Sequence, residues 1–114
     1  MMIEYPQDVI RELGALRDQA ELGAKVLADA EIKLVQLELA ADKQESLVFL
    51  EAQGSVADRN HVARIKSIDQ REAAELAKVE VNRIKVKLKQ LSEAQMNVQT
   101  QARMVELQWK TAGR

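Results

Sequence analysis

A stripe of mostly small and apolar residues, spaced alternately three and four positions apart, runs from Leu13 to Val48. This spacing places every member on one side of an α-helix, and it is the pattern by which two helices pack along their length. The stripe therefore predicts a long helix that packs lengthwise against a second one. Its members are Leu13, Leu16, Ala20, Gly23, Leu27, Ala30, Leu34, Leu37, Ala41, Gln44 and Val48.

The first helix is expected from about residue 7 to about residue 53. The only proline, Pro6, stands where a helix begins, since the first turn needs no backbone N–H donor. No glycine occurs between Gly23 and Gly54, and the apolar residues are mostly Ala, Leu, Val and Ile, with only three aromatic side chains. This composition favours packed helices over a β-sheet.

A turn is expected at residues 54–55. Gly54 ends the helical pattern, and Ser55 followed by Asp58 is typical of a helix N-cap with a carboxylate that reaches back. A second helix should then extend from about residue 56 to about residue 111. Because the link is short, the two helices must be antiparallel neighbours. We predict an all-α fold, a long antiparallel helical hairpin of coiled-coil type in which residues 1–114 form one domain.

The second helix has a regular stripe only in its later part. That part comprises Ile84, Leu88, Leu91, Gln95, Val98, Ala102, Val105 and Trp109. The earlier apolar residues are offset from its register: Val62, Ile65, Ile68, Leu76 and Val79. We expect a stutter, bend or short break between about residues 67 and 74.

The position of the turn predicts which residues meet. Gly23 is expected near Val86 and Leu88, because large side chains oppose small ones in interdigitating layers. For the same reason Leu34 and Leu37 are expected to face Ala73, Ala74 and Ala77. At the far end Trp109 is expected near Ile3 and Tyr5. The predicted helix-packing interface consists of Leu13, Leu16, Leu27, Leu34, Leu37, Val48, Ile84, Leu88, Leu91, Val98, Val105 and Trp109.

The first helix has more apolar residues than one partner helix covers. They are Ile10, Val26, Ile32, Val35, Leu39, Leu47 and Leu50, which we expect beside the stripe, where they widen its apolar face. Two hairpins packed as a four-helix bundle would bury them, so a homodimer is the first expectation and a protein partner with one or two helices is the second. Gln44 and Gln95, at stripe positions, either specify register or lie where the bundle is hydrated, and both interpretations stay open.

Charge divides the chain into an acidic and a basic half. Residues 1–58 contain 5 Lys/Arg against 12 Asp/Glu, whereas residues 59–114 contain 12 against 6. Two antiparallel helices with this distribution attract each other, and parallel association of two acidic helices is disfavoured.

Catalytic chemistry is not expected. His61 is the only histidine and cysteine is absent, which excludes a Ser-His-Asp set, an HExxH pair and thiolate metal sites within one chain. There is no glycine-rich phosphate loop, so we expect no cofactor and no small-molecule substrate. No apolar run approaches the roughly 18 residues of a membrane span. We expect a non-enzymatic protein of the cytoplasm.

The turn also shows a family resemblance. Residues 49–59, FLEAQGSVADR, resemble the turn of a class of small coiled-coil proteins of tailed bacteriophages, in which a similar FLxAxGSVxxR segment joins two long helices. Such proteins tend to be encoded among recombination and replication genes, beside single-strand annealing or single-strand-binding proteins. The resemblance implies a viral protein in the host cytoplasm that assists DNA recombination or replication. It implies no particular binding residues.

The leading hypothesis is a coiled-coil adaptor or accessory protein that acts through protein–protein interaction, with itself and with a partner of unknown identity. A second hypothesis is an accessory factor that binds nucleic acid directly through basic residues near the turn. Those candidate residues are Arg59, Arg64, Lys66 and Arg71.

A third hypothesis is an inhibitor or chaperone that presents the acidic first helix to a host protein. The acidic residues that such a surface would use include Glu31, Glu38 and Asp42.

The hairpin predicts that its first half does not fold alone. A fragment of residues 1–53 exposes its whole apolar stripe, and a single helix of this kind gains most of its stability from packing. We expect its circular dichroism signal to fall gradually on heating. A cooperative thermal transition of this fragment would contradict the predicted hairpin.

Overall fold

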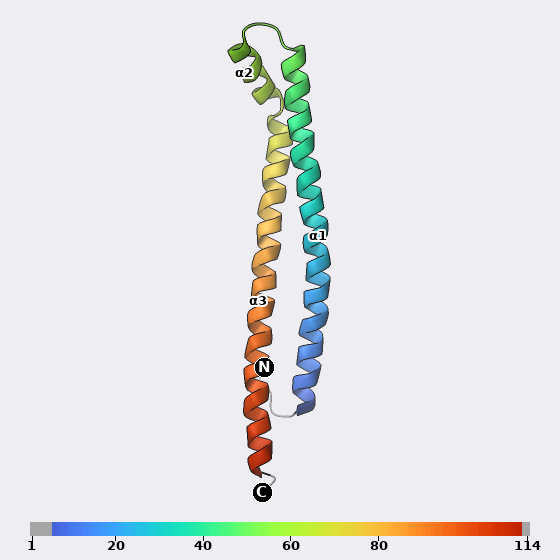
Figure 1. Ribbon diagram of the computed structural model, residues 1–114, viewed down its shortest axis with the longest axis vertical. Helices are drawn as coiled ribbons and strands as arrows, with labels where there is room; N and C mark the ends of the chain where they lie inside the picture. The colour runs from blue at the N-terminus through green and yellow to red at the C-terminus, as the bar shows by residue number, and fades with distance from the viewer. Residues whose placement is uncertain (1–5, 113–114) are drawn as a thin grey trace. The chain divides into compact units, whose positions relative to one another are not determined.

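The computed structural model describes residues 6–112, and every regular element in that range is helical. The chain forms α1 (Pro6–Glu51), α2 (Val56–Lys66) and α3 (Ile68–Ala112) (Figure 1). It divides into two compact units: unit 1 comprises Met1–Val26 with Ile84–Arg114, and unit 2 is Leu27–Arg83. In each unit the α1 segment packs antiparallel to the α3 segment. The predicted all-α fold with two long antiparallel helices is confirmed, whereas the dimer stays a prediction.

The core of the described part of unit 1 is a ladder of apolar side chains between α1 and α3. Val9 and Leu16 from α1 form one cluster with Val98 and Val105 from α3. Farther along, Gly23 makes room for Leu88: a Cβ atom added to this glycine would lie 2.5 Å from Leu88 Cδ2. The predicted pairing of Gly23 with Leu88 is therefore confirmed, whereas Val86, the other expected neighbour, is exposed.

The core of unit 2 is built mainly from small residues. Its buried apolar side chains are Ala41, Val48, Ala63, Ala74 and Val81. The inward-facing positions keep the three-and-four spacing from Ser67, directly before α3, through Gln70, Ala74, Ala77 and Val81 of α3. The larger residues Ile65, Ile68, Leu76 and Val79, which made the sequence look irregular here, are exposed. The register of α3 therefore needs no stutter, because alanines take the inward positions.

The helix break lies at Ser67, between α2 and α3 (Figure 1). The Ser67 hydroxyl donates a 2.6 Å hydrogen bond to the Ala63 carbonyl, and the Ser67 amide donates a 3.1 Å bond to the same oxygen. A serine that bonds to the preceding turn in this way bends or ends a helix. Ser67 is also completely buried, so its small size matters as well as its hydroxyl.

The turn between α1 and α2 depends on Gly54 and Ser55. Gly54 has a φ of +115°, a conformation that L-residues rarely adopt, and the Asp58 carboxylate packs against it. Ser55 is the N-cap of α2, because its hydroxyl accepts a 3.1 Å hydrogen bond from the Asp58 amide. The predicted N-cap is present, and the expected helix start follows directly after it.

Arg59 joins the start of α2 to the end of α1. Its Nε donates a 3.1 Å hydrogen bond to the Phe49 carbonyl, and its guanidinium lies 4.2 Å from the centre of the Phe49 ring. The last turn of α1 has no basic residue of its own, so Arg59 brings positive charge to the negative end of the helix dipole. The turn is thus held by contacts at both of its ends.

Substitution of Gly54 should show how much the turn depends on glycine. We expect Gly54→Ala to lower the free energy of unfolding by about 1–3 kcal/mol, because a Cβ atom strains the backbone at this φ and meets Asp58 Oδ2 at 3.3 Å. Gly14→Ala is the matched control: nothing lies within 4 Å of its added Cβ, so alanine should stabilise α1 by about 0.5–1 kcal/mol. Urea denaturation measures both, and equal effects would contradict the strained turn.

Candidate functional site

In unit 2, α1 is apolar on two opposite faces. The inward face includes Ala30 and Leu34, which are half-buried, and Ala30 lines a groove together with residues of α3. Ile32 lies two residues from each of them, and two residues correspond to about 200° of rotation, so it points away from α3. Leu39 has the same relation to Leu37 and Ala41.

The outward face has its own regular spacing of four, three and four residues. We name it the outer seam, and it consists of Ala28, Ile32, Val35 and Leu39. The exposed fractions of its three large side chains are 57% for Ile32, 53% for Val35 and 62% for Leu39. These residues were expected beside the inward stripe, and that expectation is wrong. They form a separate stripe to which a further helix can pack.

A second surface of unit 2 is a shallow groove of about 390 Å³ between α1 and α3. We name it the alanine groove, and it is lined by Ala30, Lys33, Leu37, Ala73, Leu76, Ala77 and Glu80. Its alanines are too short to fill the space between the helices. Leu76 stands at the side of the groove with 62% of its surface exposed.

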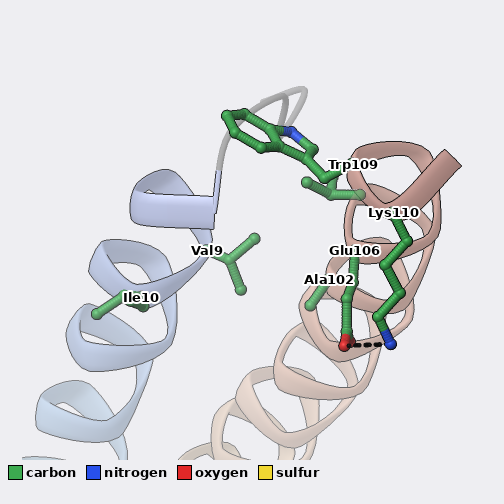
Figure 2. A pocket seen from close by; sticks show the side chains of 7 residues that line it. Val9, Ile10, Ala102, Glu106, Trp109 and Lys110 are labelled. Atoms are coloured by element: carbon green, nitrogen blue, oxygen red, sulfur yellow. Dashed lines mark ion pairs between the residues drawn. The ribbon is translucent and has the colours of Figure 1, made fainter. Parts of the chain in front are cut away.

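Unit 1 has an apolar groove of about 460 Å³ near the start of α1. Figure 2 shows Val9 on α1 pointing toward α3 and Trp109 reaching from α3 over the space between the two helices. The Glu106 carboxylate and the Lys110 ammonium form a 3.1 Å ion pair at the edge of this groove. The predicted contact of Trp109 with Ile3 and Tyr5 lies outside the described residues.

The four basic residues proposed for nucleic-acid contact have different environments. Arg59 is engaged with the carbonyl and the ring of Phe49. Arg64 and Lys66 are exposed in the last turn of α2, and no ion pair within residues 6–112 includes them.

Arg71 is engaged with two carboxylates of α1. Its Nη2 donates hydrogen bonds to Glu45 and, at 2.8 Å, to Asp42. These bonds, that to Glu45 first, raise the pKa of the guanidinium above its ordinary value. The basic and acidic halves of the chain thus meet here, and two of the four cations are occupied within the molecule.

The three acidic residues proposed for a host-protein surface also differ in their pairing and exposure. Asp42 pairs with Arg71, while Glu31 is exposed and Glu38 is half-buried. Glu38 and Glu31 form no ion pair within the described part of the chain. The acidic surface that remains unpaired is therefore smaller than the sequence indicates.

The residues predicted for helix packing lie mostly on the inward faces. Leu16, Val48, Val98 and Val105 are buried, and Trp109 is 52% exposed. The remaining members are half-buried: Leu13, Leu27, Leu34, Leu37, Ile84, Leu88 and Leu91. Gln44 and Gln95 are half-buried too.

Sequence reasoning missed two features of these surfaces. It treated Leu76 as an irregular member of the packing stripe, and it did not separate the outer seam from the inward stripe. The signal for the outer seam was present in its spacing, which repeats that of the inward stripe two positions away. The matching of large with small side chains already placed Ala73 and Ala77 opposite Leu37, but it did not indicate that these alanines leave a groove.

The side chains that could bind a metal ion are not grouped in the described part of the chain. His61 is exposed on α2, and within residues 6–112 no three side chains of the metal-binding types gather into a possible site. Among the helices of these same residues, none has the length and apolar character that crossing a bilayer requires.

Comparison of the chain with protein-family models, with curated proteins and with solved structures finds no match.

The contact between Arg59 and Phe49 predicts a stabilising role for this arginine. We expect Arg59→Ala to lower the free energy of unfolding by about 1–2 kcal/mol, since it removes a hydrogen bond and a cation–π contact. Arg64→Ala, one helical turn and a half farther along α2, should change it by less than about 0.5 kcal/mol. Thermal or urea denaturation compares the two variants, and equal losses would show that the contact does not stabilise the turn.

Proposed function

We propose that this chain is a non-enzymatic coiled-coil adaptor or accessory protein that works as a homodimer and docks a helix of a protein partner. The outer seam is the observation on which the proposal rests. A helix that is apolar on two opposite faces fits between two other helices, and α3 covers only one of the two faces of α1 in unit 2. Large apolar side chains at regular spacing on a folded helix are typical of a helix-docking surface.

The size of the outer seam indicates how a partner binds. Burying the exposed parts of Ile32, Val35 and Leu39 stabilises a complex by roughly 3 kcal/mol at the usual value per apolar side chain. Micromolar affinity requires about 8 kcal/mol. A partner must therefore contact more than the outer seam. Leu47 and Leu50 are also exposed on α1 nearer the turn, but polar residues Asp42, Lys43 and Ser46 separate them from Leu39.

The biological setting that we propose is DNA recombination or replication of a tailed bacteriophage in its host cytoplasm. Support for it comes from the turn sequence FLEAQGSVADR. The first and last residues of this segment, Phe49 and Arg59, contact each other, and Gly54 and Ser55 make the turn between them. The shared residues thus have a structural task, so the resemblance supports a common turn more directly than a common partner.

Direct nucleic-acid binding is less favoured than protein docking. Arg59 and Arg71 are occupied within the molecule, which leaves Arg64 and Lys66 as free cations of the proposed cluster. Affinity for a phosphate backbone grows with the number of phosphates neutralised, so two cations give only weak, salt-sensitive binding.

Capture of partners with and without an intact outer seam tests the proposal. The immobilised full chain is compared with Ile32→Glu/Leu39→Glu in a bacterial lysate, and we expect the double variant to lose at least tenfold in captured partner because it places two charges in an apolar contact. The matched control is Leu22→Glu/Leu107→Glu, which changes two leucines of similar exposure in unit 1. Equal capture by all three proteins would contradict docking at the outer seam.

A further inference from the structure

We infer that the alanine groove is the surface through which two copies of this chain pair, around a two-fold axis that runs along the helices. The inference rests on the proposed homodimer and specifies its contact residues and its symmetry. It concerns unit 2 alone, whose α1 and α3 segments form both sides of the groove.

The shape of this surface fits a second copy of itself. A two-fold contact brings the same patch of both copies together, so each projection needs a hollow on that same patch. Here the projection is Leu76, and the hollow is the space left by half-buried Ala30, Ala73 and Ala77.

The charges at the groove indicate whether the two-fold axis runs along the helices or across them. Lys33 stands on the α1 side and Glu80 on the α3 side, and both are exposed. Lys33 belongs to no ion pair within residues 6–112, and Glu80 pairs only with Arg83 at 3.6 Å in that range. The groove therefore offers one cation and one anion for contacts with another molecule.

An axis parallel to the helices places α1 of one copy over α3 of the other. Lys33 then faces Glu80 of the second copy, and the symmetry repeats the pair. An axis perpendicular to the helices places α1 over α1, so that lysine approaches lysine and glutamate approaches glutamate. Opposite charges favour the first arrangement and like charges disfavour the second.

The same arrangement covers the exposed leucines. With α1 over α3 of the second copy, Leu76 lies against the half-buried Leu37 of that copy, which lines the same groove. Each helix segment then has antiparallel neighbours on two sides, as in an up-and-down four-helix bundle. The outer seam lies on another face of α1 and stays available for a partner helix.

Sedimentation equilibrium of the full chain tests the contact at Leu76. We expect the unsubstituted protein to form a dimer and Leu76→Glu to raise its dissociation constant at least tenfold. Leu107→Glu is the matched control, because Leu107 is 63% exposed on α3 but lies in unit 1, and it should change the constant by less than about twofold. Circular dichroism shows whether each variant keeps its helices, and Leu76→Ala replaces Leu76→Glu if the latter does not fold.

Charge reversal tests the axis independently. Lys33→Glu and Glu80→Lys should each weaken the dimer by about tenfold, because each turns two attractive pairs into repulsive ones. The double variant Lys33→Glu/Glu80→Lys restores the pairs with exchanged signs and should return the dissociation constant to within about threefold of the original.

The outcomes separate the two proposals. A chain that is monomeric at all concentrations overturns the proposed homodimer together with this interface. A dimer that is indifferent to Leu76→Glu and to both single reversals overturns the alanine groove as the contact, while the proposed homodimer stands. Single reversals that weaken the dimer without recovery in the double variant overturn the axis.

Discussion

The packing of α1 against α3 is the interaction on which the rest of the structure depends. Two helices of this length bury little else, so their stability comes from the inward-facing rows in each unit. In unit 1 these rows consist mainly of valine and leucine side chains, and Leu88 packs against Gly23. In unit 2 the rows consist mainly of alanine side chains and Ser67. Small inward residues let the helices approach closely, but they also leave the groove between the helices only partly filled.

The turn sets the register of that packing, and its contacts are local and specific. Gly54 adopts a φ that other residues avoid, Ser55 caps α2, and Arg59 binds the last turn of α1 through Phe49. On the α3 side, Arg71 binds Asp42 and Glu45. Exposed ion pairs of this kind add little stability individually. Their effect is to favour one alignment of the acidic and basic halves over neighbouring alignments one turn away.

The apolar surfaces that remain after this packing are those on which we propose that the chain associates. The outer seam and the alanine groove lie on different faces of unit 2, so one surface can serve a second copy while the other serves a partner helix. The basic residues near the turn have a mixed role, because Arg59 and Arg71 act within the molecule while Arg64 and Lys66 do not. In this molecule Phe49, Gly54, Ser55 and Arg59 of the segment FLEAQGSVADR build the reversal of the chain.

The sequence by itself determined the helical class, the reversal at Gly54, the N-cap at Ser55 and the inward row of α1. These features depend on local backbone preferences and on a periodicity that one segment shows alone. Size matching across the turn placed Ala74 and Ala77 opposite the first helix, but only the tertiary structure decided that Leu76 and Val79 face outward, since both look like core residues until the opposite helix sets the register. It also decided that Ile32 and Leu39 face away from α3, and that Arg59 and Arg71 are occupied. The physical reason is that burial and pairing are properties of two segments together, whereas helix, turn and cap are properties of one.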